Sequence, residues 1–425
     1  MSEFIVEYVR ALQVLDSRGD PTVEVNVATR GGGFGRGIAP AGASRGLREA
    51  IEIRDGGREY LGRGVERAVE SVNKYIAPAI VGMSSYRFRD IDRKLVEIDG
   101  TQNKSKLGSN AITATSLAVV NAAADTAGVP LFEFLGGRWA RSLPVPLLNI
   151  INGGTHAGNE LSFQEFMIAP VASSTFSEAI RVAVEVYKTL KEYLKKAYGP
   201  ASINVGDEGG FAPPMREVRE ALKAITKAVE NAGYRVGEDI FLALDVAASQ
   251  IYRDGFYLVD GKKISSEDLL KLYIDLVGEF PIISIEDPFA EDQPDYFREL
   301  RSELRGRALV IGDDLTVTNA EIISKYFVEG AIDGAIIKIN QVGTLTEAER
   351  AIEVLKGLRG RAIVSHRSGE TEDVSIAHIA VAYGTGLIKT GAPARGERTS
   401  KYNELIRIEN YLSGDAVYTG RKAFT

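Results

Sequence analysis

Six apolar runs recur between residues 240 and 393, and each of them ends on a polar or charged residue. The runs are Phe241–Asp245, Ile282–Glu286, Ala308–Asp313, Ala335–Lys338, Ala362–His366 and Leu387–Lys389. Their last residues stand 41, 27, 25, 28 and 23 positions apart, and most of these intervals have room for one strand, one helix and two short loops. Continuous apolar runs are typical of strands buried on both faces, so the pattern predicts a parallel sheet covered by helices.

The segments between the runs supply the helices. From Ser265 to Glu279 apolar residues recur with helical period, and a serine stands where an N-cap is expected. Leu345 to Leu358 repeats the pattern, with Thr344 and Glu347 spaced as a capping box. Strand and helix are therefore predicted to alternate through this part of the chain.

Two further apolar runs, Val145–Ile151 and Phe163–Ile168, precede these six. The linker between them is rich in Gly, Asn and Thr, which disfavour a helix, whereas a parallel crossover usually contains one. We therefore expect the two strands to be antiparallel neighbours, followed by helices near residues 175–197 and 216–232. The predicted fold class is α/β, a (βα)8-type barrel with an irregular antiparallel start, ββαα(βα)6, plus an N-terminal α+β domain.

The first 139 residues have a different pattern. Candidate strands lie at residues 5–10, 22–28 and 35–39, and helical periodicity dominates at 65–79, 89–98 and 110–127. Strands followed by helices predict an α+β unit. Two glycines and two prolines near residue 140 indicate a boundary, so the predicted domains are an N-terminal capping domain at 1–139 and a catalytic barrel at 140–425.

Composition excludes several classes of function. The chain of 425 residues has no cysteine and three histidines, which excludes disulfides and thiolate metal sites and argues against a His-rich zinc site. The net charge is −7 without runs of like charge, so we expect neither nucleic acid nor a membrane as a partner. Neither a signal peptide nor an apolar stretch of membrane-spanning length is evident, and a cytoplasmic location is expected.

The polar residues that end the six runs would meet at one rim, because parallel strands all end at the same edge and active sites of barrels lie there. Asp245, Glu286 and Asp313 offer hard oxygen ligands of the kind that Mg²⁺ prefers. Lys338 and Lys389 would share that rim, and a lysine beside other positive charge has a lowered pKa and can act as a neutral base. Proton abstraction next to a carboxylate is the chemistry that this set favours. The alternative is that charged residues at strand ends simply meet solvent.

Other candidates lie in loops. Glu165 and Glu208 follow or precede the early strands, and a lone glutamate in such a place is more often a surface residue. His366 is followed by Arg367 and Ser368, and arginine suits bidentate contact with phosphate or carboxylate.

Eleven segments in order along the chain carry a resemblance to a known family. They are Val14–Glu24, Gly42–Ser44, Leu107–Ala111, Asn149–Gly158, Gln164–Ile168, Asn204–Gly210, Ser284–Phe289, Gly312–Asn319, Lys338–Gln341, Val364–Asp373 and Lys389–Arg395. With them the chain closely resembles the enolase (phosphopyruvate hydratase) family over nearly its whole length. The resemblance implies a lyase of glycolysis and gluconeogenesis that reversibly dehydrates 2-phospho-D-glycerate to phosphoenolpyruvate with Mg²⁺.

The resemblance also implies roles for individual residues. The implied catalytic residues are Lys338 for the C2 proton, Glu208 with Glu165 for loss of the C3 hydroxyl, and His156 on a closing loop. The implied ligands of the first Mg²⁺ are Asp245, Glu286 and Asp313, and Ser44 is implied to place a second Mg²⁺ that binds with substrate. The implied substrate-binding residues are Gln164, His366, Arg367, Ser368, Lys389, Glu286 and Asp313. For Ser44 the alternative is a cap for a helix near Leu47.

Four positions depart from the family pattern: Leu12, Asp20, Ala41 and Arg45 stand where Arg, Asn, Ser and Thr are usual. The last two lie in the mobile loop and the first two in a segment that makes subunit contacts in the family. A homodimer or higher homo-oligomer, up to an octamer, is implied, and a surface or secreted fraction is known for the family. A sugar-acid dehydratase is the nearest rival, but its Lys-x-Lys on an early barrel strand has no match here. A non-catalytic surface adhesin is the rival from another class.

Overall fold

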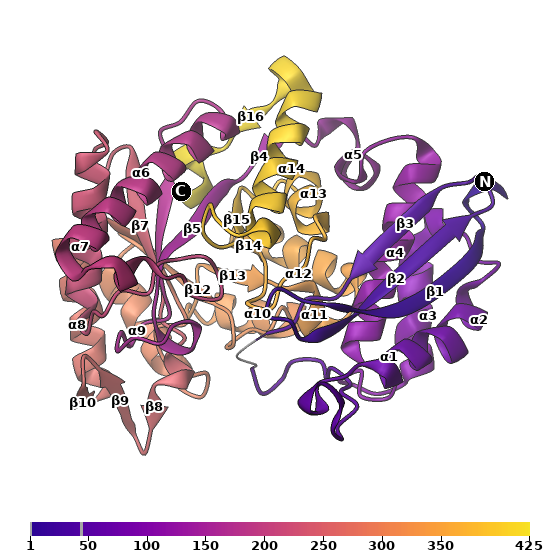
Figure 1. The fold of residues 1–425 in the computed structure, drawn as a ribbon, viewed down its shortest axis with the longest axis horizontal. Coiled ribbons are helices and arrows are strands. Elements are labelled where there is room, and N and C mark those ends of the chain that lie inside the picture. The colour runs from indigo at the N-terminus through magenta and orange to yellow at the C-terminus, as the bar shows by residue number, and fades with distance from the viewer. Residues whose placement is uncertain (1, 43–45) are drawn as a thin grey trace.

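The eight predicted barrel strands close into one barrel in the computed structural model, which describes residues 2–42 and 46–425 (Figure 1). Around the barrel the order is β11, β12, β13, β14, β15, β5, β6, β7. The strands are β5 (Val145–Asn152), β6 (Glu165–Pro170), β7 (Ile240–Asp245), β11 (Ile282–Glu286), β12 (Leu309–Gly312), β13 (Gly334–Ile337), β14 (Arg361–Ser365) and β15 (Leu387–Lys389). The predicted fold class is confirmed.

The irregular start of the barrel is also confirmed. Strand β6 is antiparallel to both of its neighbours, β5 and β7, while the remaining neighbours in the barrel are parallel. The first residue of β6, Glu165, therefore lies at the rim where the parallel strands end. It pairs in register with Asp245, the last residue of β7, and Asp245 pairs with Glu286, the last residue of β11. Paired residues project to the same side of a sheet, so the topology alone places three carboxylates in one row.

Helices cover the outside of the barrel. They are α6 (Phe176–Tyr198), α7 (Val218–Asn231), α8 (Ser266–Glu279), α9 (Pro294–Leu304), α10 (Ala320–Val328), α11 (Ile339–Val342), α12 (Leu345–Gly357), α13 (Ser375–Ala382) and α14 (Gly396–Leu412). Short strands also lie outside the barrel. Strands β8 (Tyr252–Arg253), β9 (Phe256–Val259) and β10 (Lys262–Ile264) form a three-stranded antiparallel sheet, and β4 (Ser142–Leu143) pairs with β16 (Val417–Tyr418).

The two predicted helix starts are capped in the same way, since the Ser265 hydroxyl donates to the Asp268 carboxylate as the Thr344 hydroxyl does to that of Glu347. The Ser265 hydroxyl accepts a bond from the backbone N–H of Asp268, as predicted. Thr344 likewise accepts from the N–H of Glu347, but the Glu347 carboxylate accepts the Thr344 hydroxyl and the Lys104 ammonium. Only half of the capping box is therefore present.

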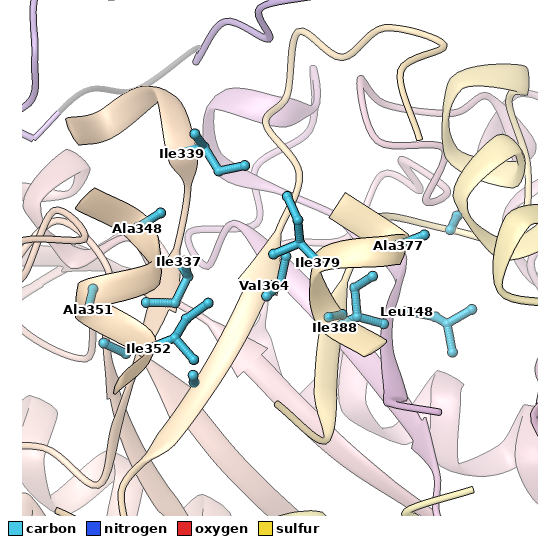
Figure 2. Close-up of a cluster of buried hydrophobic side chains, with 14 of the residues drawn as sticks. Leu148, Ile337, Ile339, Ala348, Ala351, Ile352, Val364, Ala377, Ile379 and Ile388 are labelled. Atoms are coloured by element: carbon cyan, nitrogen blue, oxygen red, sulfur yellow. The ribbon is translucent and has the colours of Figure 1, made fainter. Parts of the chain in front are cut away.

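Strand residues alternate between two layers of the core. Ile336, Ile363, Leu387 and Leu147 belong to the cluster inside the barrel, and Phe424 also belongs to it. Each residue that follows along the strand points outward into the larger core. Figure 2 shows three of these outward residues, Ile337, Val364 and Ile388, close to the labelled alanines and isoleucines of α12 and α13. This two-sided burial is the reason for the continuous apolar runs in the sequence.

The N-terminal unit is an antiparallel sheet with helices on one side. Its strands are β1 (Val6–Leu15), β2 (Pro21–Thr29) and β3 (Phe34–Ile38), and its helices include α3 (Phe88–Asp99), α4 (Ser109–Ala127) and α5 (Leu131–Gly136). Glycines alternate along β3, and a Cβ at Gly35 would collide with the backbone of α4 at Ala118 and Ala122. The missing side chains therefore let α4, which is buried on nearly all sides, lie directly on the sheet.

The helix predicted at 65–79 is interrupted. It consists of α1 (Glu66–Ser71), a π-helical turn (Val72–Ile76) and α2 (Ala77–Ile80). Pro78 lacks the N–H that a continuous helix would use, and the wider turn precedes it. Asn73 in this turn bonds both the N–H and the C=O of Ala11 on edge strand β1.

In the part of the chain that the structure describes, no single helix is long and apolar enough to span a membrane. Helix α4 and residues 131–139 meet the length and hydropathy criteria only when taken together, and this pair is bent by 90°. The division into domains at residues 139 and 140 stays a prediction.

Candidate active site

A small cavity opens at the rim where the parallel barrel strands end. Its walls come from the loops after β5, β13 and β14, from the loop between α6 and α7, from the ends of β6, β7 and β15, and from Gly42 of the N-terminal unit. The lining residues are Gly42, His156, Gln164, Glu165, Glu208, Asp245, Lys338, Ser365, His366, Arg367, Ser368 and Lys389. Most of the predicted site residues are thus brought together, although they lie far apart in the sequence.

Three predicted site residues do not line the cavity. Glu286 and Asp313 are buried at its base, where they contact Lys389 and Lys338. Ser44, predicted to place a second metal ion, lies outside the described residues, as does Arg45. The alternative of a helix near Leu47 is wrong for the part described, because residues 47–49 form a turn.

Lys389 is the centre of a buried charge cluster. Its Nζ lies 2.8 Å from Asp245 Oδ2, 2.8 Å and 2.9 Å from the two oxygens of Glu286, and 3.2 Å from Glu165 Oε1. Burial lowers the pKa of Lys389, but the carboxylates of Asp245, Glu165 and Glu286 outweigh it and hold the pKa well above its usual range. The row of carboxylates formed by the strand register is therefore neutralised in part by one ammonium group.

Lys338 forms the second ion pair of the site, with Asp313. The other oxygen of Asp313 accepts a bond from Gln341 Nε2 at 3.1 Å. Burial lowers the pKa of Lys338, but the adjacent Asp313 charge outweighs it, so the protein groups raise this pKa. The sequence-based expectation of a lowered pKa is wrong for the protein alone, because it counted the neighbouring positive charge and missed the direct carboxylate contact.

The donor set fits a divalent cation. Asp245 and Glu286 both contact the Lys389 ammonium group. Burial, and next the charge of Asp245, raise the pKa of Glu286 well above its usual range, although Lys389 and Lys338 lower it. These donors are buried carboxylate oxygens, with no sulfur ligand among them. Such donors suit Mg²⁺.

Among the described residues, two groups of acidic or imidazole ligand atoms come within 4.8 Å of one another, and the predicted set of Asp245, Glu286 and Asp313 is not one of them. One consists of His156, Glu165 and Glu208, and the other of Asp287, Asp313 and Asp314. The two oxygens of Asp287 already accept the backbone N–H groups of Asp313, at 2.8 Å, and Asp314, at 2.7 Å. Asp287 therefore holds the backbone at Asp313 and Asp314 in place and does not line the cavity.

Glu208 and Glu165 are both buried, which excludes the alternative that they are surface glutamates. Glu208 Oε2 accepts a bond from Asn149 Nδ2 at 3.0 Å, and Oε1 lies 3.4 Å from His366 Nε2 and 3.6 Å from His156 Nδ1. Glu165 Oε2 has no hydrogen-bond partner. Burial, and next the charge of Glu208, raise the pKa of Glu165 well above its usual range. Lys389, 3.2 Å from Glu165 Oε1, acts in the opposite direction and lowers this pKa.

The two histidines of the cavity are uncharged at neutral pH. Burial lowers the pKa of His366 to about 3, and burial also lowers the pKa of His156. His366 Nε2, 3.4 Å from Glu208 Oε1, has no hydrogen-bond partner among the described residues.

Arg367 and Ser368 line the same cavity. The Arg367 guanidinium donates to Glu49 Oε2 at 2.9 Å, Glu49 Oε1 at 3.3 Å and Asn340 Oδ1 at 3.2 Å. Glu49 was not predicted from the sequence. A buried arginine needs a carboxylate partner, but nothing in the sequence indicates that Glu49 is that partner. Gln164, which also lines the cavity, donates from Nε2 to Asp245 Oδ2 at 3.3 Å and accepts from Thr155.

Fold and site together define the class: a barrel enzyme with an acid–base active site at the carboxyl end of its strands, partly closed by an N-terminal α+β unit. Comparison with known families is specific. The model described as "Enolase, N-terminal domain" matches residues 6–135, and the model described as "Enolase, C-terminal TIM barrel domain" matches residues 140–425.

Whole-chain relatives agree. The enolase of Aeropyrum pernix is 54% identical over 420 residues, covering 99% of this chain and 97% of that protein. The enolase of Pyrococcus furiosus is 53% identical over 417 residues (97% and 96%), and that of Methanocaldococcus jannaschii is 51% identical over 418 residues (98% of each). The chain belongs to the enolase family, and it is a lyase of glycolysis that acts on a small-molecule substrate.

Proposed function

We propose that the protein catalyses the reversible, Mg²⁺-dependent dehydration of 2-phospho-D-glycerate to phosphoenolpyruvate. The observation that carries this proposal is that two lysines, paired with buried carboxylates, line the same cavity as Arg367 and Ser368. A substrate with a phosphate, a carboxylate and a β-hydroxyl group presents matching groups to these side chains.

Binding and orientation come from the cationic side chains. Arg367 and Ser368 would hold the phosphate, since a guanidinium gives two parallel hydrogen bonds to such oxygens. Lys389 would contact the substrate carboxylate. Asp245, Glu286 and Asp313 would hold Mg²⁺, whose charge stabilises the second negative charge that develops on the carboxylate when C2 loses its proton.

Lys338 is proposed as the base that removes the C2 proton. Its side chain lines the cavity and is nearly enclosed, so water does not compete for the proton. Reaction requires the neutral amine, whereas Asp313 favours the ammonium form. Loss of the lysine proton is therefore a step that the enzyme must complete before C2 is deprotonated.

Glu208 and Glu165 are proposed to protonate the departing C3 hydroxide. Both approach His156, and burial together with the charge of Glu208 raises the pKa of Glu165 well above its usual range, which lets the pair carry one proton. Gln164 and His156 border the same end of the cavity. Ser44 would take part in placing a second Mg²⁺ when substrate binds.

The direct test is phosphoenolpyruvate formation by the purified protein with and without a chelator. We expect activity that is lost with chelator and restored by added Mg²⁺. Activity that persists without any divalent cation would reject the mechanism.

The role of Lys338 is tested by exchange of the C2 hydrogen in deuterium oxide. Lys338→Ala should abolish exchange while substrate still binds, and Lys271→Ala, at an exposed lysine on α8, should leave exchange intact. Normal exchange in Lys338→Ala would remove this residue as the base. The homo-oligomeric state and the cytoplasmic location stay predictions.

A further inference from the structure

Arg398 is an arginine without access to solvent that no step above uses. It lies near the start of α14, and its relative exposure is 0%. Together with Lys401, Tyr402, Leu405 and Ile408 it forms the buried stripe of that helix, in which two positions that usually carry apolar residues carry charges. A cation buried in this way is costly unless its donors are used.

The guanidinium of Arg398 bonds two separate loops of the active site. It donates to the backbone carbonyls of Arg367 and Ser368, each at 2.6 Å, and to the carbonyl of Asp207 at 3.1 Å. The first two belong to the phosphate-facing segment after β14, and Asp207 precedes Glu208. One side chain therefore sets the distance between the segment that carries Glu208 and the segment that carries Arg367.

Arg398 also decides where the proton of His366 lies. Its Nη1 is 2.6 Å from His366 Nδ1, and a guanidinium can only donate hydrogen bonds. Nδ1 must then be the acceptor, so the neutral ring carries its proton on Nε2. That nitrogen lies 3.4 Å from Glu208 Oε1, while Asn149 donates to the other oxygen of Glu208.

We propose that Arg398 is a positioning residue that holds His366 as the Nε2–H tautomer and thereby orients the Glu208 carboxylate toward the cavity. Its bonds to the two loops fix the position of Glu208 relative to Arg367. The meaning for catalysis rests on the role proposed above for Glu208, whereas the tautomer and the loop contacts do not depend on it.

The surroundings of Arg398 are shaped for this side chain. Gly391 has a positive φ of 80°, and a Cβ there would meet Glu208 O at 2.7 Å and Arg398 Cδ at 2.9 Å. One turn further along α14, Lys401 donates to the carbonyl of Thr371, and Tyr402 donates to the carbonyl of Gly391 at 2.5 Å. Lysine at position 398 would have a single nitrogen and could not reach acceptors in so many directions.

The first test uses the unmodified, full-length protein without substrate. The chain has only three histidines, so ¹⁵N-histidine labelling gives three ring systems by NMR, and His366→Gln identifies the ring of interest. We expect the His366 ring to show an unprotonated Nδ1 and a protonated Nε2. The Nδ1–H tautomer, or a doubly protonated ring at neutral pH, would overturn the proposal while leaving the proposed reaction untouched.

The second test compares Arg398→Met and Arg398→Lys with Arg407→Met, a control at an exposed arginine on the same helix. Arg398→Met should lower kcat by about 10- to 100-fold, as when a group that orients a catalytic residue is lost, shift the pH profile, and give a mixture of His366 tautomers. Arg398→Lys should restore part of the Nε2–H signal, and Arg407→Met should match the unmodified protein.

A folded Arg398→Met protein with unchanged kcat and an unchanged His366 signal would refute the positioning role. If Arg398→Met does not fold, the tautomer in the unmodified protein and the behaviour of Arg398→Lys still decide the question. Loss of phosphoenolpyruvate formation in every variant and in the unmodified protein would instead count against the proposed function.

Discussion

Replacing Asp92 with asparagine perturbs the contact between the N-terminal unit and the barrel. Asp92 on α3 is buried, and its Oδ2 accepts the backbone N–H of Thr346 at 3.0 Å and the Thr346 hydroxyl at 2.6 Å. Thr346 lies in the first turn of α12, a few residues beyond Lys338. Asp92 Oδ1 has no partner, so this carboxyl group is only half satisfied when ionised.

The magnitude follows from the pKa. Burial, offset in part by the hydrogen bonds from Thr346 and Ser116, raises the pKa of Asp92 from 3.8 to about 6. A raised pKa means that the folded state binds the proton more tightly than the unfolded state does. The resulting stability is fully present below pH 3.8 and is lost as the pH rises through about 6. About two pKa units correspond to about 3 kcal/mol in the free energy of unfolding, of which about 2 kcal/mol is lost between pH 4 and 7.

Thermal unfolding at several pH values measures this effect. Asparagine keeps an oxygen for Thr346 but does not titrate, so the free energy of unfolding of Asp92→Asn should improve relative to the unmodified protein by about 2 kcal/mol between pH 4 and 7. For a chain of this length that equals a relative shift of about 2 °C in Tm. Asp90→Asn, at a more exposed residue of the same helix paired with Arg87 and Arg93, is the control and should show little change. A difference between Asp92→Asn and the unmodified protein that stays constant with pH would refute the reasoning.

Three further substitutions test the site and the core. Glu49→Gln removes the carboxylate that orients Arg367, and should raise KM for the phosphorylated substrate about 10-fold with little change in kcat; an unchanged KM would show that other contacts hold Arg367. Lys389→Met leaves its carboxylate neighbours unpaired and should lower Tm without metal, with Mg²⁺ recovering more stability than in the unmodified protein; equal recovery in both would contradict this. Ile336→Ala empties part of the barrel interior and should destabilise the protein by about 2–5 kcal/mol, measured by denaturant unfolding, whereas the exposed Val328→Ala should have little effect.

Much of the barrel was predictable because its signals are local. Each strand is a short apolar run, each helix has its own period, and the helix-breaking linker between the first two strands predicted their antiparallel pairing, which the structure confirms. The helix predicted at residues 65–79 is confirmed by the helical segments from 66 to 80, and the π-helical turn at Val72–Ile76 is the detail that the periodicity did not predict.

The site was predictable only in part. Residues at strand ends were found because parallel strands share an edge, so Asp245, Glu286 and Lys389 follow from the strand pattern. Glu49 and Arg398 were missed because nothing in their neighbourhoods along the chain indicates a buried partner; their roles come from contacts with residues 318 and 32 positions away. Charged positions on the apolar stripe of α14 were the one available sign of Arg398.

The sequence by itself determined the layout of strands and helices, the rim at which carboxylates and lysines gather, and the family. Only the tertiary structure decided which charges touch, and with that the pKa direction of Lys338, the partner of Arg367 and the tautomer of His366. The reason is physical: strand and helix formation depends on patterns over a few residues, whereas the charge state of a buried group depends on distances of a few ångströms between residues that chain order does not relate.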